Sequence, residues 1–234
     1  MPVHILSKRD EIAKHVIVVG DPLRAKNLST LLESPKLVNE NRCLLTYTGK
    51  WRGEPITIAT HGVGAPSAAI VFEELALLGA RNIVRLGTAG SIDDNLELGS
   101  VVIADSTPMY VGGCSTRQYF GDYIPPLSPS FDLLLRVRRV FERHQVKHKL
   151  GPVFCSDAFY AETPYLKKDL EKMKVLAVEM EAGILYALGK VRGFNALAIL
   201  IISNRVGSHE FLDNSYLNRK FEEIVPLVFD ALIS

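Results

Sequence analysis

Two carboxylates stand inside an otherwise apolar stretch of the sequence between Leu176 and Leu188. Glu179 and Glu181 are flanked there by alanine, valine, methionine, isoleucine and leucine. An ionised carboxylate that is buried without a partner costs several kcal/mol or more. The fold must therefore bring an arginine, a backbone cap or the hydroxyls of a ligand to both glutamates.

The spacing of this stretch predicts a core helix that begins near Met180. Residues two apart in a helix are separated by about 200° of turn, so the two glutamates would point to opposite sides. They can converge only if Glu179 ends an extended segment and Glu181 opens the helix. A helix start that holds an acid in an apolar pocket is suited to gripping a sugar. The alternative is a carboxylate stabilised by the helix dipole and one salt bridge.

Chain length and charge narrow the class of protein further. The 234 residues suit one domain over residues 1–234, and the formal net charge is +1. A balance of this kind gives no electrostatic reason to bind nucleic acid or a membrane surface. The hydrophobic content of 47% fits a buried parallel sheet, an oligomer with apolar interfaces, or both.

The cysteines and the N-terminal residues favour a soluble cytoplasmic protein. Cys43, Cys114 and Cys155 are widely spaced, and the sequence has no cysteine–histidine cluster with the spacing of metal ligands. We therefore expect neither a metal site nor a disulfide framework. The first residues are not typical of a signal peptide, and the longest apolar run, 196–202, is too short to span a bilayer.

Apolar runs and helical patterns alternate along the chain, which indicates an α/β fold. Strands are expected over 15–20, 43–47, 55–60, 82–86, 100–105, 148–155 and 194–203. Helices are expected over 22–32, 66–79, 131–143, a segment ending near 173, 180–188 and 215–233. We infer a single domain with a mixed, mostly parallel central β-sheet covered by helices. Residues 107–127 form a long irregular segment, of the kind that is usually functional or lies at an interface.

Polar and glycine-rich clusters follow five of the expected strands. They are residues 20–24, 60–67, 85–91, 156–160 and 203–207. In open α/β sheets, ligands bind at the carboxyl ends of the strands. We therefore expect the five clusters to line one pocket.

The clusters at 20–24 and 85–91 contain groups that bind oxyanions. Gly20 precedes a predicted helix that Asp21 caps, with Arg24 one turn in. Arg85 lies in an apolar strand, where an arginine needs a partner, and Thr88 follows it with a hydroxyl. Taken singly, Arg24 is typical of a solvated helix residue and Arg85 of a core salt bridge. Together they make a phosphate cradle.

Two further ring side chains in these clusters have more than one interpretation. Phe159, which follows a strand, can stack on a base or can simply pack in the core. His61, in a glycine-rich loop, is interpreted as a hydrogen-bonded loop residue rather than a catalyst.

Several motifs occur together and in order along the chain. They are His4, Gly20-Asp-Pro-x-Arg24, Arg85-x-Gly-Thr-x-Gly90, Ser156-Asp-x-Phe-Tyr160 and Val178-Glu-Met-Glu181. In this combination the chain resembles the nucleoside phosphorylases that form trimers of dimers. That family includes bacterial-type purine nucleoside phosphorylase, uridine phosphorylase and archaeal methylthioadenosine phosphorylase. The resemblance spans essentially the whole chain and implies the nucleoside phosphorylase fold. It also implies a homo-oligomer, a hexamer built from dimers that share active sites.

The resemblance implies roles for individual residues. Phosphate would be held by Gly20, Arg24, Arg85, Thr88 and, from a neighbouring subunit, Arg42. Ribose would be bound by Glu179, Met180, Glu181 and, from a neighbouring subunit, His4. The base would lie against Gly90, Phe159, Val178, Ser203, Asn204 and Arg205. The small-molecule partners implied are a nucleoside and inorganic phosphate as co-substrate, with no cofactor and no metal.

The implied mechanism follows from charge, with Arg85, Glu181 and Asn204 as the catalytic residues. Cleavage of the C–N bond builds positive charge on the ribose as the base leaves. A phosphate held below C1′ by arginines stabilises that charge and then adds to C1′. Glu181 holds the sugar so that the two reacting atoms meet in line.

The chain resembles the commonest pattern of purine phosphorylases except at Asn204. At the corresponding position those enzymes have an aspartate, which protonates the purine N7. An amide cannot act as that acid, so we expect 6-oxopurines such as guanosine and inosine to be preferred over adenosine. The pair Asn204-Arg205 also resembles uridine phosphorylase, where an arginine reads a pyrimidine carbonyl. Those enzymes add a glutamine and an arginine after the Phe-Tyr pair, whereas this chain has Ala161-Glu-Thr-Pro-Tyr165 there.

Four other functions are weighed against purine phosphorolysis. Uridine or methylthioadenosine phosphorylase would keep the fold and change the substrate. A nucleosidase would use water and would have no need of Arg24, Arg42 and Arg85 together. A nucleoside-binding protein without turnover would tolerate the loss of these arginines, and all three are present.

Overall fold

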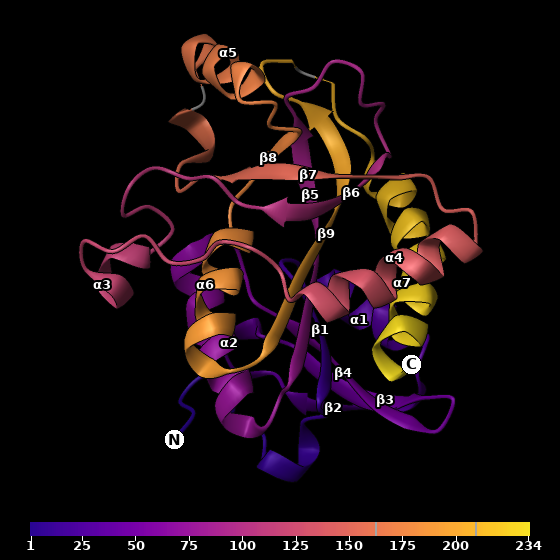
Figure 1. The fold of residues 1–234 in the computed structure, drawn as a ribbon. Helices are drawn as coiled ribbons and strands as arrows, with labels where there is room; N and C mark the ends of the chain where they lie inside the picture. The colour runs from indigo at the N-terminus through magenta and orange to yellow at the C-terminus, as the bar shows by residue number, and fades with distance from the viewer. Residues whose placement is uncertain (162, 209) are drawn as a thin grey trace.

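The computed structural model describes residues 1–161, 163–208 and 210–234. In these residues the strands form one mixed sheet flanked by helices, which confirms the α/β class (Figure 1). The strands are β1 (His15–Val19), β2 (Glu33–Asn39), β3 (Thr46–Trp51), β4 (Glu54–Thr60), β5 (Asn82–Ser91), β6 (Val101–Ser106), β7 (His148–Cys155), β8 (Ala177–Glu179) and β9 (Asn195–Arg205). The α-helices are α1 (Pro22–Ser29), α2 (Ala65–Leu78), α3 (Thr116–Phe120), α4 (Phe131–Arg143), α5 (Pro164–Lys172), α6 (Ala182–Arg192) and α7 (Asn214–Ile233). Short 3-10 turns are η1 (Arg9–Glu11), η2 (Asn41–Cys43) and η3 (Phe159–Ala161).

Helices cover both faces of the sheet (Figure 1). α2 and α6 pack on one face, where their apolar side chains join those of Val16 and Val18 from β1. α1, α4 and α7 pack on the other face, around Ile17 and Val19 of the same strand. Burial on both faces explains why the central strands are continuously apolar rather than alternating. Among the described helices, none has the length and apolarity that crossing a bilayer requires.

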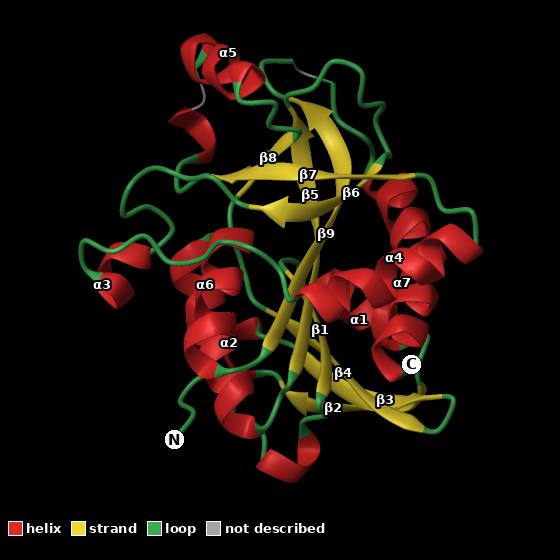
Figure 2. Ribbon diagram, in the orientation of Figure 1, coloured by secondary structure: helices red, strands yellow, loops and turns green. Residues whose placement is uncertain are grey.

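Part of the sheet closes on itself (Figure 2). β5 pairs with β1 and, along its whole length, with β9, while its last residues pair with β8. β8 pairs with β7, β7 with β6, and β6 with β9. The strands β5, β8, β7, β6 and β9 therefore form a ring. The sheet is mixed, as the sequence predicts, because the pairs β2–β3, β3–β4, β5–β8 and β6–β9 are antiparallel.

β5 and β9 extend beyond their expected ends into two of the polar clusters. β5 continues to Ser91 and β9 to Arg205, so the clusters at 85–91 and 203–207 lie largely within strands rather than after them. The reason is the long pairing between β5 and β9, which is interrupted by a single register shift between Ala89 and Gly90. Pairing over this length holds glycines in extended backbone, where the local pattern indicates a turn.

The N-terminal third contains one confirmed and several corrected predictions. Asp21 caps α1, its Oδ1 accepting a hydrogen bond from the Leu23 amide at 2.8 Å, and Pro22 is the first helical residue. The helix ends at Ser29 rather than at residue 32, and the strand expected over 43–47 begins only at Thr46. β2 was not predicted, because its sequence is polar and contains a proline, as an exposed edge strand permits.

The segment 107–127 packs its first half on β7. Cys114 Sγ lies 2.8 Å from Cys155 Sγ, and the ring of Tyr110 stands edge-on to Phe154. The backbone amide of Thr107 donates to the carbonyl of Leu127, which closes the segment at its base. The segment contains α3 and is otherwise irregular.

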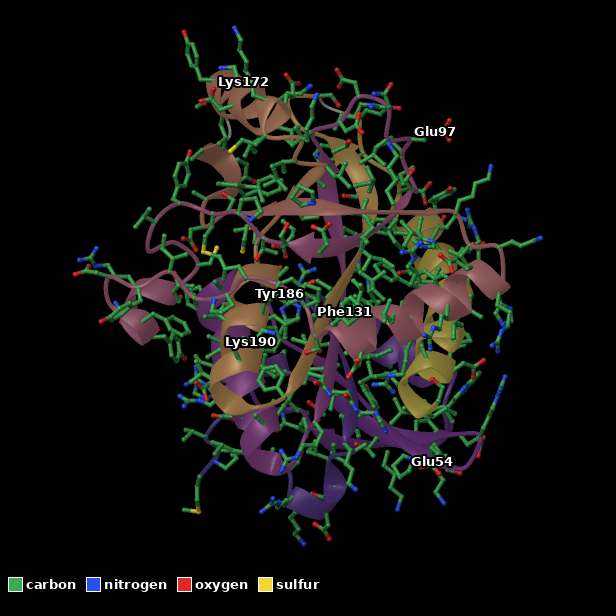
Figure 3. The ribbon with its side chains drawn as sticks, in the orientation of Figure 1. Glu54, Glu97, Phe131, Lys172, Tyr186 and Lys190 are labelled. Atoms are coloured by element: carbon green, nitrogen blue, oxygen red, sulfur yellow. The ribbon has the colours of Figure 1, made fainter. Side chains whose placement is uncertain are left out.

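Tyr186 links α6 to the sheet by two hydrogen bonds. Its hydroxyl donates to the carbonyl of Ala104 at 2.6 Å and accepts from the amide of Ala198 at 3.0 Å. Figure 3 shows this side chain inside the molecule, whereas Lys172 lies at the periphery. A fully buried tyrosine needs both of these bonds, so the N-terminus of α6 is held at a fixed place relative to β6 and β9.

Candidate active site

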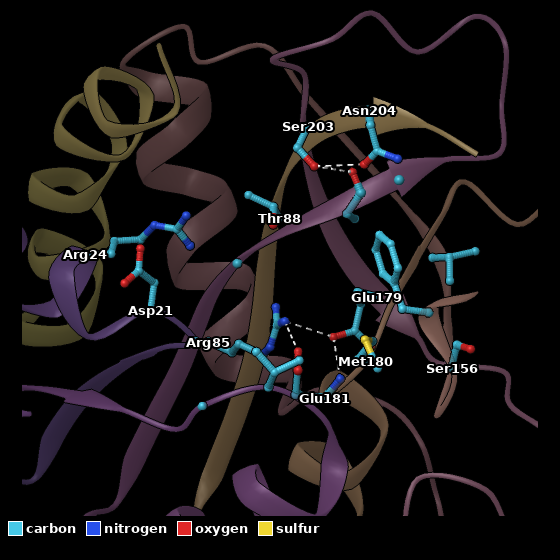
Figure 4. Close-up of a pocket in the computed structure, with 18 of the residues that line it drawn as sticks. Asp21, Arg24, Arg85, Thr88, Ser156, Glu179, Met180, Glu181, Ser203 and Asn204 are labelled. Atoms are coloured by element: carbon cyan, nitrogen blue, oxygen red, sulfur yellow. Dashed lines mark hydrogen bonds and ion pairs between the residues drawn. The ribbon is translucent and has the colours of Figure 1, made fainter. Parts of the chain in front are cut away.

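A pocket of about 490 Å³ opens at the ends of the central strands. All five clusters that the sequence singles out contribute to its lining, which confirms that they meet. Twelve of the predicted site residues line it: Gly20, Arg24, Arg85, Thr88, Gly90, Phe159, Val178, Glu179, Met180, Glu181, Ser203 and Asn204. Figure 4 shows most of them around the same space.

An ion cluster forms the floor of the pocket. Arg85 Nη2 pairs with Glu181 Oε2 and lies 3.3 Å from Glu179 Oε2. All three residues are at most 5% exposed. The cluster supplies the partners that two carboxylates in an apolar stretch require.

The two glutamates converge by the geometry that the sequence predicts. Glu179 is the last residue of β8, and Glu181 is the residue before the first turn of α6. Glu179 Oε2 accepts from the amides of Glu181 and Ala182, each at 2.8 Å, so Glu179 caps the helix. Glu181 Oε1 is thereby free to accept from the amide of Gly64 at 2.6 Å. Glu179 thus caps the helix, whereas Glu181 binds the Gly64 loop and Arg85.

Burial and the charge of Arg85 together shift the pKa values of the two carboxyl groups in opposite net directions. Burial raises the pKa of Glu179, because the Arg85 charge offsets only part of the cost. Burial also acts to raise the pKa of Glu181, but Arg85, with smaller effects from His61 and the Gly64 amide, outweighs it and lowers the pKa. Glu181 therefore stays ionised more firmly than Glu179, and an ionised carboxylate is the better acceptor for sugar hydroxyls.

Gly87 is required by the close approach of Arg85. The Arg85 side chain lies over the backbone two residues further along β5, and a Cβ at Gly87 would overlap its guanidinium. Glycine at this position lets the arginine lie flat against the strand. Among the described residues, Nε and Nη1 of Arg85 and Oε1 of Glu179 have no hydrogen-bond partner. The floor therefore retains donors and an acceptor for a ligand.

Arg24 lies to one side of the Arg85 ion cluster, at the left of Figure 4. It lies in the first turn of α1, behind Gly20, whose small size keeps the loop close to His61 and Gly62. Burial lowers the pKa of Arg24, an effect that Asp21 opposes and Arg85 reinforces. Two arginines, an exposed helix N-terminus and the Thr88 hydroxyl therefore face one volume.

The other end of the pocket is neutral. The Ser203 hydroxyl donates to Oδ1 of Asn204 at 3.0 Å and lies 3.4 Å from the carbonyl of Ala89. A Cβ at Gly90 would lie 3.3 Å from Asn204 Nδ2, so the amide packs directly on that glycine. Nδ2 has no bond within the described part of the chain and can donate to a ligand. Phe159 is half-exposed there, which favours a stacking role over core packing.

Three predicted site residues lie elsewhere in the described structure. His4 Nδ1 is 2.8 Å from Glu74 Oε1 and does not line the pocket. Arg42 is exposed in η2, where it has a positive φ of 54°. Nη1 of Arg205 donates to the carbonyl of Asp94 at 3.1 Å and does not line the pocket. The first two were expected to act in a neighbouring subunit, whereas Arg205 was expected to act within this one.

The ring of His61 differs from its prediction as a hydrogen-bonded loop residue. The side chain is fully buried and stands edge-on to Phe72, with 5.6 Å between the ring centroids. Neither ring nitrogen has a partner among the described residues. Burial lowers its pKa to about 4, so the imidazole is neutral at pH 7. The loop's hydrogen bonds are made by its backbone instead, since its carbonyl accepts from the Ser67 hydroxyl.

Comparison with known proteins agrees with this site. The sequence model of the phosphorylase superfamily matches residues 14–227. Purine nucleoside phosphorylase DeoD-type from Exiguobacterium sp. is 36% identical, with 100% of this chain and 98% of that protein covered. The protein of the same name from Clostridium perfringens is 35% identical over 100% of both chains.

Solved structures give the same result for the fold. Uridine phosphorylase from Vibrio fischeri superposes with a TM-score of 0.84 and is 30% identical, with 99% of this chain and 93% of that chain covered. The match extends over the ring of strands and over both layers of helices, because it leaves almost no part of the chain out. The chain belongs to the phosphorylase superfamily.

Proposed function

We propose that this protein catalyses phosphorolysis of purine ribonucleosides to the free base and ribose 1-phosphate. The observation that carries the proposal is the meeting of Arg24, Arg85 and Glu181 in one pocket. Two cations can hold a phosphate, and an ionised carboxylate beside them can hold a sugar. The names of the relatives, purine nucleoside phosphorylases, support the purine as substrate.

Phosphate is proposed to bind between the two arginines. The backbone at Gly20, the N-terminus of α1 and the Thr88 hydroxyl add donors. Arg85 contributes Nη1, because Nη2 is occupied by the carboxylates. Arg85 thus acts on both substrates at once, as a phosphate donor and as the support of Glu181.

The charge balance of the pocket supports a shared site. Within the described lining, two arginines face three carboxylates, which are Asp21, Glu179 and Glu181. A phosphate anion would add negative charge to a site that already has a formal excess of it. Arg42 of a second copy would supply the missing cation, and His4 of that copy would reach the sugar 5′ position. A hexamer built from dimers meets this need, and an active monomer in sedimentation runs at assay concentration would contradict it.

Catalysis then follows from the positions of the charges. Glu181 holds the ribose 2′ and 3′ hydroxyls, with Met180 against the sugar face and Glu179 beside them. As the base leaves, the positive charge on the ribose develops next to the bound phosphate, which stabilises it and adds to C1′. The buried ion cluster keeps Glu181 in place, so the two reacting atoms are held in line.

The neutral end of the pocket is proposed to hold the base. Phe159 and Val178 would lie on its faces, while Gly90, Ser203 and Asn204 would meet its edge. A 6-oxopurine offers N7 and O6 as neighbouring acceptors, and the Asn204 amide can donate to them as negative charge develops on the leaving base. A 6-aminopurine presents a donor beside N7, so the Asn204 amide cannot donate to both positions and would have to reorient to accept from the amino group. We therefore propose guanosine and inosine as better substrates than adenosine.

Uridine phosphorylase is the second candidate, supported by the neighbour from Vibrio fischeri and by the pair Asn204-Arg205. In this structure Arg205 is bonded to the Asp94 carbonyl, outside the pocket lining. Reading a pyrimidine would require the arginine to leave that bond and swing inward. Methylthioadenosine would require a 5′ pocket that accepts a thioether. A nucleosidase or a nucleoside-binding protein would not need Arg24 and Arg85 to bind phosphate.

One assay distinguishes these functions. Base release is measured for inosine, guanosine, adenosine, methylthioadenosine and uridine, with and without inorganic phosphate. We expect release to depend on phosphate, ribose 1-phosphate to form, and kcat/KM to be highest for the two 6-oxopurine nucleosides. Equal turnover without phosphate would contradict phosphorolysis. A preference for uridine would contradict the purine assignment.

A further inference from the structure

Arg24 differs from Arg85 in what holds its side chain. Arg85 is fixed by two carboxylates, whereas Arg24 has no ion pair among the described residues. The nearest carboxylate along the chain, Asp21, is committed to the Leu23 amide as the cap of α1. An arginine side chain has about 2 kcal/mol of rotamer entropy to lose, so an unheld Arg24 would sample many positions at the pocket rim.

An aromatic ring takes the place of the missing carboxylate. Arg24 Cζ lies 4.3 Å from the ring centroid of Phe221, which belongs to α7, almost 200 residues further along the chain. This is well within the roughly 6 Å over which a cation is attracted to a ring face. Phe221 is fully buried in the core on that side of the sheet, so the ring itself cannot move aside.

Stacking on Phe221 orients the guanidinium of Arg24 without neutralising its positive charge. A carboxylate partner would have cancelled the charge that a phosphate needs, whereas a ring face holds a guanidinium and leaves its charge and its N–H edge available. Nε of Arg24 is buried, and no partner for it exists within the described residues. The guanidinium is therefore held beside the pocket with unused donors.

We infer that Phe221 is a positioning residue for phosphate, acting through Arg24. The ring fixes the plane of the guanidinium at the pocket rim and so connects the C-terminal helix to the phosphate site. This inference rests on the proposed function, because phosphate is the ligand that Arg24 is proposed to hold. It assigns a role to a residue that lies outside the pocket lining and outside every motif in the sequence.

Phe229 offers a matched control on the same helix. It is also fully buried in the same core cluster, and its ring packs on Trp51 with 5.3 Å between the centroids. Phe221→Leu and Phe229→Leu therefore remove the same group from the same helix. Only the first removes a ring face from Arg24.

The experiment measures KM for inorganic phosphate and for inosine in both variants. For Phe221→Leu we expect KM for phosphate to rise about five- to tenfold, the size of one cation–π contact, with KM for inosine unchanged. Phe229→Leu should leave KM for phosphate within about twofold of the wild type, within the spread expected for a distant site. Phe221→Tyr keeps the ring face and should restore most of the phosphate affinity.

A double-mutant cycle with Arg24→Ala tests whether Phe221 acts through the arginine. With Arg24 removed, Phe221→Leu should change KM for phosphate by less than about twofold. An unchanged phosphate KM in Phe221→Leu, an equal rise in Phe229→Leu, or a full effect in the Arg24→Ala background would each overturn the inference. Those outcomes leave phosphate-dependent turnover in the wild type intact. If turnover by the wild type did not require phosphate, the proposed function and the inference would both be wrong.

Discussion

The two ends of the pocket are built on opposite principles. At the floor, Arg85, Glu179 and Glu181 are buried and linked by ion pairs, and backbone amides of two segments, the Gly64 loop and the start of α6, donate to the two carboxylates. At the base end, Ser203 and Asn204 are neutral and partly exposed, and their side chains make no ion pair among the described residues: Ser203 Oγ bonds to Asn204 Oδ1 and to the carbonyl of Ala89. The floor is therefore a unit in which each member depends on the others. The base end consists of side chains that can be exchanged one at a time.

This difference separates two kinds of change. A substitution at the floor leaves an uncompensated charge in a low-dielectric place and acts on folding as well as on catalysis. A substitution at the base end alters the hydrogen-bonding pattern that a ligand meets, at little cost to the fold. Chemistry common to many substrates is thus fixed at one end, and substrate choice is set at the other.

The largest expected effect follows from removing the central charge of the floor. Arg85→Met leaves two buried carboxylates without their cation, so the free energy of unfolding should fall by about 3–5 kcal/mol. Arg205→Met is the matched control, because Arg205 makes one exposed hydrogen bond to a carbonyl. We expect that variant to stay within about 0.5 kcal/mol of the wild type. Urea denaturation at pH 7 measures both, and equal losses would contradict the dependence of the fold on the buried charge of the floor.

A smaller effect is expected from the buried imidazole behind the floor. The pKa of His61 is lowered to about 4, so the folded protein excludes a proton that the unfolded chain binds below pH 6.5. Stability from this group is fully present above pH 6.5 and is lost as the pH falls toward 4. A shift of this size corresponds to about 3 kcal/mol.

His61→Leu removes that titration and keeps the site apolar. The loss of unfolding free energy between pH 7 and pH 4 should therefore be about 3 kcal/mol smaller in the variant than in the wild type. The comparison uses differences between two pH values, so a constant effect of the substitution on stability cancels. If the unfolding free energies of the two proteins changed equally with pH, His61 would not contribute to the pH dependence of stability.

The smallest expected effect in free energy is at the base end. Asn204→Asp introduces a carboxyl group that can protonate the N7 of the leaving purine. We expect the ratio of kcat/KM for adenosine to that for inosine to rise about tenfold, or about 1.4 kcal/mol, with the free energy of unfolding nearly unchanged. Measuring the ratio in both proteins tests the assignment. A ratio that stays constant would remove Asn204 from the reading of the base.

The convergence of Glu179 and Glu181 is the part of the site most accessible from sequence. Two carboxylates in an apolar stretch impose a strong physical requirement, and only one arrangement of strand and helix lets Glu179 and Glu181 converge. The Asp21–Pro22 start of α1 was readable for a similar reason, since capping is a local interaction between neighbouring residues. Both features depend on residues that are close in the chain.

Features that depend on distant residues could not be read in this way. The extension of β5 past Gly87 exists because β9 lies beside it, and no local pattern contains that partner. The contact between Arg24 and Phe221 joins α1 to α7, and Phe221 has the periodicity of an ordinary core residue. The bond of Arg205 to the Asp94 carbonyl could not be predicted for a similar reason, because Asp94 lies far away in sequence.

The closure of β5 on β9 also has a consequence for how the chain acquires its structure. Asn82 and Asn195, which open this pairing, are 113 residues apart, so the contact must close a very long loop. Pairings of such long range are formed slowly, because loop-closure entropy is lost before the contacts are made. During synthesis β5 leaves the ribosome long before its partner does. Until β9 is synthesised, one edge of β5 stays unpaired, and an unpaired strand edge of this kind favours aggregation of folding intermediates.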